Sequence, residues 1–165
     1  MYPEAPFYVI DTDDSVARMY REGFSDVRNI ELAVAETWEE FCSAVEIFIA
    51  SARKYGITTK REQSPWLVVD MSDVTWDRVQ NYYTEQVFGK SSADYFLFAR
   101  QSLSAKAKAL QPLEGWTDWQ VINKLYQAQW IKLTHSQYFN LYITAKVGPV
   151  DLNMKENANL YRSFR

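Results

Sequence analysis

Acidic, hydroxyl and basic side chains follow three separate apolar runs of this chain. The run "FYVID" leads into "DTDD" from Asp11, and "WLVVD" leads into "DMSD" from Asp70. A later run, "NLYI", leads into Thr144 and Lys146. Carboxylates that reach Mg²⁺ through its waters, with a lysine to stabilise charge on a transferring phosphoryl group, suit a magnesium–polyphosphate ligand. The question is whether the fold brings these groups together.

Four strands and five helices are predicted to position them. Aromatic and β-branched runs predict strands at Pro6–Asp11, Asn29–Ala35, Trp66–Asp70 and Tyr138–Val147. Helical spacing and capping residues predict helices from Asp14 or Ser15 to Met19, from Glu36 or Thr37 to Gly56, at Val74–Phe88, at Ala93–Leu110, and from Thr117 or Asp118 to His135. Strands that alternate with helices predict an α/β fold with a mainly parallel sheet. Ligands bind beyond the carboxyl ends of such strands, so the three polar clusters should share one edge.

The composition sets outer limits on the class of protein. The chain has 165 residues, 47% of them hydrophobic, which predicts one domain with a sizeable core. A net charge of −3 argues against a general electrostatic grip on nucleic acid, although a local basic groove stays open. The single cysteine, Cys42, excludes an internal disulfide. We expect a cytoplasmic protein, because no apolar run reaches the roughly 18 residues of a membrane span and the N-terminus does not resemble a signal peptide.

The letters G-K-S at Gly89–Ser91 resemble the end of a phosphate-binding loop, but the motif fails. Its first glycine would fall on Thr84, and a helix rather than a strand precedes it. Glycine is common just past the end of a helix, so Gly89 is interpreted as a helix terminator.

The three strand ends together resemble the RecA-like P-loop NTPases. "WLVVDMSD" looks like their Walker B strand, "FYVIDTDD" like an earlier strand that ends in Asp-x-acid, and "NLYITAKV" like the later sensor strand. "LEGWTDWQVINKLY" is similar to a stretch in AAA-type ATPases of bacteriophages. The resemblance covers about residues 7 to 147. It implies a RecA-like three-layer sandwich in residues 1–149, followed by a polar tail at 150–165.

The resemblance also implies roles for particular residues. Asp70 would bind Mg²⁺ through water, with Ser72 beside it in the nucleotide site. Asp13 would be the general base, in place of the more usual glutamate, and Thr144 would sense the γ-phosphate. Lys146 would lie near phosphate. Asp11 would be structural, and the cofactors would be Mg²⁺ and ATP.

The Walker A loop of this family is absent from the 165 residues, whose glycines start no G-x-x-x-x-G-K-[ST]. The loop would therefore lie before Met1. We expect its strand to belong between the strands that end at Asp70 and Thr144, where its loss would leave a gap. A strand from elsewhere could fill the gap, the neighbours could close up, or the chain could be part of a longer protein, which we favour. Without the loop, this chain alone should hydrolyse ATP poorly or not at all.

Ordinary structural roles are the alternatives for the same residues. Asp70 could cap the following helix, and helix capping could explain one of the aspartates around Asp13. His135, the only histidine, ends a predicted helix, where a cation is favoured. Cys42 is expected in the core.

Aromatic and basic residues later in the chain have two interpretations each. Trp116 and Trp119 could stack on bases, but core packing is the simpler role. Arg100, Lys106 and Lys108 could form a basic face or a solvated helix surface.

The strand-end residues and the resemblance are compatible with two functions. The first is the core of a phage-type ATPase, in host cytoplasm if phage-encoded, that acts on nucleic acid or a phage protein assembly and can form homo-oligomers. The second is a protein-interaction module on the same scaffold that has lost catalysis.

Overall fold

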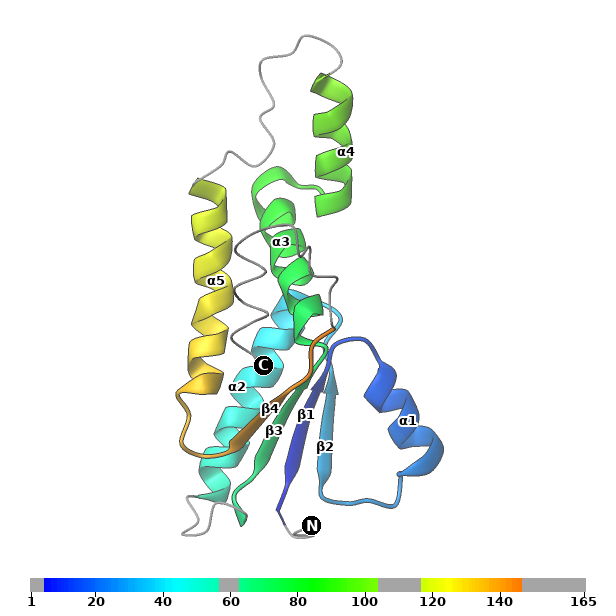
Figure 1. Ribbon diagram of the computed structural model, residues 1–165, viewed down its shortest axis with the longest axis vertical. Helices are drawn as coiled ribbons and strands as arrows, with labels where there is room; N and C mark the ends of the chain where they lie inside the picture. The colour runs from blue at the N-terminus through cyan, green and yellow to red at the C-terminus, as the bar shows by residue number, and fades with distance from the viewer. Residues whose placement is uncertain (1–4, 57–62, 104–116, 147–165) are drawn as a thin grey trace, which may run out of the picture.

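The computed structural model describes residues 5–56, 63–103 and 117–146. Their elements follow the order of Figure 1: β1 (Phe7–Asp11), α1 (Ser15–Gly23), β2 (Ile30–Val34), α2 (Trp38–Tyr55), β3 (Trp66–Asp70), α3 (Ser72–Phe88), α4 (Ser92–Leu103), α5 (Thr117–Thr134) and β4 (Asn140–Ile143). This is the predicted alternation of strands and helices. The predicted tail at 150–165, Trp116, Lys106 and Lys108 lie outside the described residues.

The four strands form one parallel sheet in the order β2-β1-β3-β4. The predicted α/β class with a parallel sheet is therefore confirmed. The expected gap is wrong, because β4 pairs directly with β3 from Trp66↔Asn140 to Val69↔Ile143. The Thr144 N–H extends the ladder by donating to the Val69 carbonyl at 3.0 Å. No strand is missing between these neighbours, since their backbone groups satisfy one another.

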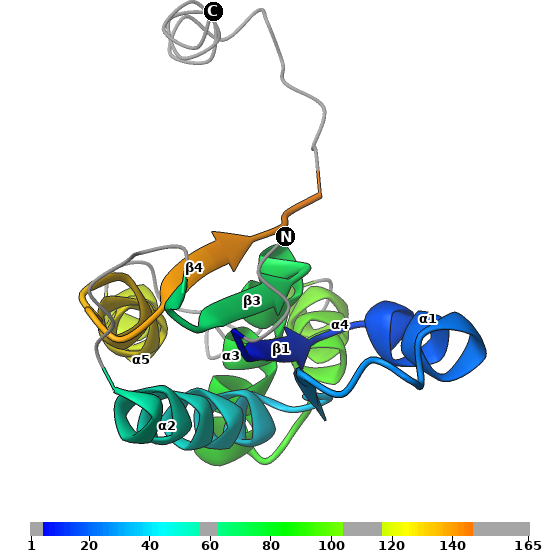
Figure 2. The same cartoon turned by 90° about the horizontal axis from the view of Figure 1, so that it is seen from below.

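Helices cover the two faces of the sheet unequally. Right-handed crossovers require α1 on one face and α2 on the other, because β2 and β3 flank opposite sides of β1. Figure 2 shows α2, α3 and α5 together on one side and α1 on the other. On the first side, Tyr8 of β1 stacks on Phe48 of α2, with ring centroids 5.2 Å apart. This side holds the main core.

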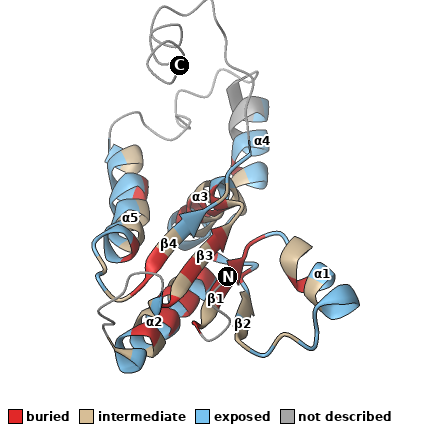
Figure 3. Ribbon diagram, turned by 60° about the horizontal axis from the view of Figure 1, so that its bottom comes forward, coloured by how far each residue is buried: buried red, intermediate tan, exposed pale blue. Residues whose placement is uncertain are grey.

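The core consists of alternate strand residues and the inward faces of the long helices, which Figure 3 shows as buried. Its fully enclosed side chains include Ile10, Phe41, Val45, Leu67, Val69, Val79, Ile122 and Leu133. Trp119 packs against this core and stacks on Trp76, with centroids 6.1 Å apart. Cys42 is half-buried against the same cluster, as expected of a core cysteine, and burial raises the pKa of its thiol to about 11.

Local sequence signals explain where the helices begin and end. The Thr37 hydroxyl accepts from the Glu40 N–H at 3.1 Å, and the Glu40 carboxylate accepts from the Thr37 N–H at 3.0 Å, so a capping box starts α2. Gly89 ends α3 in the left-handed conformation, with φ 65°. The G-K-S letters therefore belong to a helix terminus, as the sequence predicted.

No helix in the described part of the chain is long and apolar enough to cross a membrane.

Candidate functional site

The carboxyl ends of β1, β3 and β4 meet at one rim of the sheet, where the Asp70 carboxylate links the end of β3 to α1 and to the segment after β4. Its Oδ1 accepts a hydrogen bond from the Thr144 hydroxyl, which follows β4. Its Oδ2 accepts from the hydroxyl of Ser15, the first residue of α1, at 3.0 Å. The Thr144 oxygen also accepts from the Met71 N–H at 2.7 Å. Residues 55 and 74 positions from Asp70 thus converge on it.

Three carboxylates form the centre of this rim. One oxygen each from Asp11, Asp13 and Asp70 lies within 4.8 Å of the other two. We refer to these residues as the acidic triad. Carboxylate oxygens are the ligands that Mg²⁺ prefers, so the donor set fits this ion, held in part through its waters. Neither ion pair found in the described ranges involves the triad.

Asp11 is the structural member of the triad. It is fully buried, and its Oδ2 accepts from the Ala17 N–H of α1 at 2.7 Å. Its Oδ1 accepts from the Asp13 N–H at 3.3 Å. Asp11 therefore caps the first turn of α1 from the end of a strand. This corrects the prediction that Asp14 or Ser15 caps α1, because Asp14 occupies the N-cap position without a side-chain hydrogen bond.

Asp13 is exposed at the outer side of the rim. Its Oδ1 accepts from the Ser15 N–H at 3.1 Å. Hydrogen bonding by Ser15 is the main cause that holds the pKa of the Asp13 carboxyl below its usual value, against a smaller opposing effect of burial. Asp13 is consequently ionised at neutral pH and open to solvent, as a cation ligand or a water-orienting base requires.

Asp70 does not cap the helix that follows it. The N-cap of α3 is Met71, which makes no side-chain cap, so the capping alternative for Asp70 is not what the structure shows. Its half-buried carboxylate instead bonds to hydroxyls of two other elements. Both hydroxyls leave lone pairs on the Asp70 oxygens for metal-bound water.

Ser72 and Lys146 lie where the start of α3 meets the segment after β4. Ser72 is buried at the start of α3, and its N–H donates to the Thr144 carbonyl at 2.9 Å. The Lys146 N–H donates to Asp73 Oδ1 at 3.0 Å, which fixes its backbone at the rim. Lys146 itself is exposed.

Two residues of the rim were missed by sequence reasoning. Thr12 is almost fully buried, and its hydroxyl lies 2.8 Å from the Asp70 carbonyl and 2.9 Å from the Met71 carbonyl. Arg78 of α3 donates from Nη2 to the Thr12 carbonyl. The only sequence signal for Arg78 was its place beside Val79 and one turn after Thr75, on the buried face of α3.

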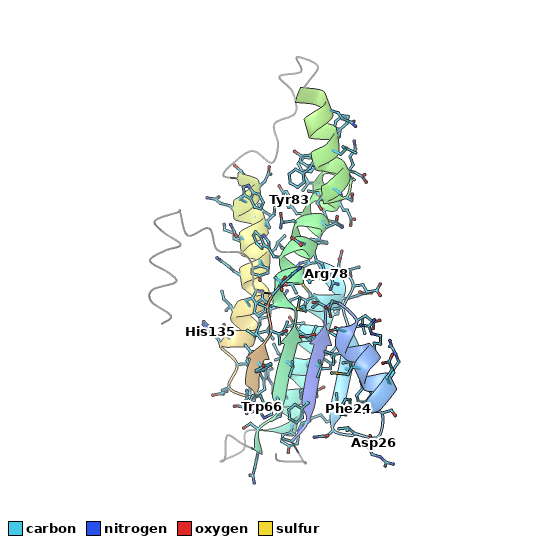
Figure 4. The ribbon with its side chains drawn as sticks, turned by 45° about the vertical axis from the view of Figure 1, so that its right-hand side comes forward. Phe24, Asp26, Trp66, Arg78, Tyr83 and His135 are labelled. Carbon is cyan, nitrogen blue, oxygen red and sulfur yellow. The ribbon has the colours of Figure 1, made fainter. Side chains whose placement is uncertain are left out.

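A hollow of about 390 Å³ lies away from the rim, between α2 and the end of α5. Arg53, His135 and Tyr138 help to line it, and Arg53 lies over the Tyr138 ring, 5.3 Å from its centroid. Figure 4 shows His135 at the side of the molecule, far from Arg78 and the rim. The hollow contains none of the triad; the convergent carboxylates and hydroxyls lie at the rim instead.

Comparison of the chain with protein-family models, with curated proteins and with solved structures gave no match.

Proposed function

We propose that this chain is the core of a RecA-like ATPase, with a magnesium–nucleotide site at the rim. The observation that carries the proposal is the convergence on Asp70 of Thr144 and Ser15, beside the carboxylates of Asp11 and Asp13. Residues that the resemblance assigned to one site from three strand ends are neighbours in space. Their order in the chain and their chemistry both suit a phosphoryl-transfer enzyme.

Each residue has a role that its contacts support. Asp70 orients metal-bound water, because two hydroxyl donors fix both of its oxygens. Asp13, ionised and exposed, accepts a hydrogen bond from the attacking water and orients it. The Thr144 hydroxyl donates to Asp70 and accepts from the Met71 N–H. A change in its contact with the γ-phosphate would therefore also change its hydrogen bonds to the end of β3 and to the start of α3. Bound Mg²⁺ would neutralise charge on the β- and γ-phosphates.

The loop that grips the phosphates must come from outside the described residues. In the described sheet, β2 and β4 are the edge strands, and β4 is the one that leads into Thr144. We place the additional strand of the ATPase at the outer edge of β4. From there its following loop would face Asp70. The expectation that this strand lies between β3 and β4 is replaced by this position.

Calorimetry with Mg²⁺, with and without ATP, tests the proposal. We expect weak saturable binding of Mg²⁺ and slightly tighter binding of Mg²⁺–ATP, both lost in Asp70→Ala. Asp26→Ala is the matched control, since Asp26 is exposed and lies at the opposite end of the sheet (Figure 4). Absence of heat at millimolar Mg²⁺–ATP, or equal binding by Asp70→Ala, would contradict the nucleotide site.

An interaction module without catalysis is the second candidate, and one observation favours it. Apolar side chains are exposed at the end of α3 and along α4: Val87, Phe88, Phe96, Leu97 and Phe98. Figure 1 shows α4 extending away from the sheet. Such a surface suits contact with another protein. Concentration-dependent association that Leu97→Lys abolishes, together with no heat from Mg²⁺–ATP, would favour this function over the ATPase.

A further inference from the structure

Two strained turns meet at the rim. The first connects β1 to α1 and the second connects β3 to α3. Asp14 in the first has φ 60° and Met71 in the second has φ 56°. These are the non-glycine residues with positive φ in the described part of the chain. Left-handed backbone is unfavourable for such residues and persists only where surrounding contacts enforce it. Contacts that enforce both turns should therefore be visible at the rim.

Thr12 is the first such contact. It belongs to the first turn, and its hydroxyl reaches the carbonyls of Asp70 and Met71 in the second. A hydroxyl has one proton, so this donor is shared between two acceptors. Because Thr12 is almost fully buried, water does not compete for the proton. The link joins the residue before Asp13 to the backbone of Asp70 itself.

Arg78 is the second contact. Its Nη2 donates to the Thr12 carbonyl, while its Nη1 is buried without a hydrogen-bond partner. Burial is the main cause that lowers the pKa of this guanidinium, and nearby Glu36, Glu40, Asp11 and Asp13 oppose that effect. A half-buried arginine with an unsatisfied nitrogen lowers the stability of the fold, so we expect a contact at the rim that explains its position.

We propose that Thr12 and Arg78 act as a clamp that holds Asp13 and Asp70 at cation-binding spacing before the cation arrives. Three carboxylates within 4.8 Å repel one another, and no ion pair in the described ranges offsets this. The clamp opposes the repulsion in two ways. Hydrogen bonds fix the two turns, and the positive charge of the guanidinium interacts favourably with Asp11 and Asp13.

Arg78 and Thr12 are thus positioning residues that do not touch the ligand. The consequence is preorganisation, because a site already at the right spacing loses less freedom when the cation binds. This inference rests on the proposed function, which supplies the cation. Its structural half, that the clamp holds like charges together, can be tested without metal.

The first experiment measures Mg²⁺ affinity by calorimetry in wild type, Arg78→Lys and Arg78→Met. We expect an affinity loss of about tenfold or more in Arg78→Met, of the size seen when supporting residues of metal sites are removed. The affinity of Arg78→Lys should lie between those of wild type and Arg78→Met, since lysine keeps the positive charge but lacks the planar set of guanidinium N–H donors. Arg21→Met is the matched control, because Arg21 pairs with Asp14 of the same turn at 3.5 Å but is exposed. Unchanged affinity in folded Arg78→Met would overturn the clamp.

The second experiment uses urea unfolding in metal-free buffer. Asp13→Asn should raise the folded-to-unfolded ratio of Arg78→Met about tenfold more than that of wild type, because it removes the repulsion that the clamp opposes. A purely structural arginine predicts additive effects, which would overturn the proposal. If Arg78→Met does not fold, the same coupling with Asp13→Asn is measured in Thr12→Val, which removes the hydroxyl, with Thr12→Ser as the control that keeps it. Coupling without Mg²⁺ binding by wild type would support the clamp and overturn the proposed nucleotide site.

Discussion

Asp11 and Asp70 occupy equivalent positions in the sheet but differ in burial and in their hydrogen-bond partners. They are register partners at the ends of β1 and β3, and each follows four apolar or aromatic residues. Asp11 is fully buried and accepts from two backbone N–H groups of its own turn and helix. Asp70 is half-buried and accepts from hydroxyls of α1 and of the segment after β4.

The difference shows that the neighbours, rather than the strand pattern, decide the role of a terminal aspartate. Backbone N–H groups need an acceptor permanently, so the aspartate that serves them is structural. Hydroxyl groups can turn to other acceptors, so the aspartate that they bond remains free to act as a ligand. At this rim the two roles are connected, because Asp11 stabilises the turn that leads into α1, and α1 begins with Ser15, whose hydroxyl donates to Asp70.

The largest effect is expected from Asp11→Ala. This change leaves the Ala17 N–H without its acceptor at a buried position and the Asp13 N–H without its acceptor at a part-buried one. An unsatisfied buried group costs about 1–3 kcal/mol and a part-buried one less, so we expect a loss of about 2–4 kcal/mol in the free energy of unfolding. Urea denaturation followed by circular dichroism measures it. A loss below about 1 kcal/mol would contradict the structural role that we assign to Asp11.

Asp70→Asn should affect stability much less. The hydroxyls of Thr144 and Ser15 can bond to the amide oxygen or to water, and one negative charge leaves the triad. We expect a change within about 1 kcal/mol of wild type in metal-free buffer, in either direction. The proposed Mg²⁺ site predicts a rise in the melting temperature of wild type on adding Mg²⁺, and this rise should be absent from Asp70→Asn. A destabilisation as large as that of Asp11→Ala would mean that Asp70 is structural too.

Sequence patterns predicted the elements of this fold better than their arrangement. The bounds of β3 and the start of α2 at Thr37 follow from residues adjacent in the chain, and they were predictable for that reason. The convergence of Asp13, Asp70 and Thr144 on one rim followed from the rule for parallel strands. Both kinds of inference need only local pattern and a general rule of topology.

Contacts between distant segments could not be predicted in this way. The pairing of β3 with β4 joins segments about 74 residues apart, and the expected gap between them was wrong. Thr12 and Arg78 meet across 66 residues, and neither carries a motif. Asp11, at the end of a strand, accepts from the Ala17 N–H of α1, whereas the Asp14 side chain makes no cap and pairs with Arg21 instead.

Thr37→Ala provides a reference for the cap that Asp11 supplies. Both residues satisfy first-turn N–H groups, but Thr37 is local and exposed, so water can replace its oxygen. We expect a loss of about 1 kcal/mol, the usual size for an exposed N-cap threonine. Thermal and urea unfolding measure the change, with Thr37→Ser as the control that keeps the hydroxyl. A loss equal to that of Asp11→Ala would show that burial does not distinguish the two caps.

The smallest effect is expected from Asp14→Gly, which tests the strain in the turn that Asp11 supports. Asp14 has φ 60° and no side-chain cap, and its ion pair with Arg21 is exposed and worth little. Glycine adopts this conformation without the steric cost of a Cβ but gains freedom in the unfolded chain. We expect a net stabilisation of about 0.5 kcal/mol, measured by urea unfolding. Asp14→Ala, which keeps the Cβ, is the control and should not stabilise. If glycine destabilises by more than alanine does, the turn is not strained at Asp14, and Asp11 stabilises it without opposing any conformational cost.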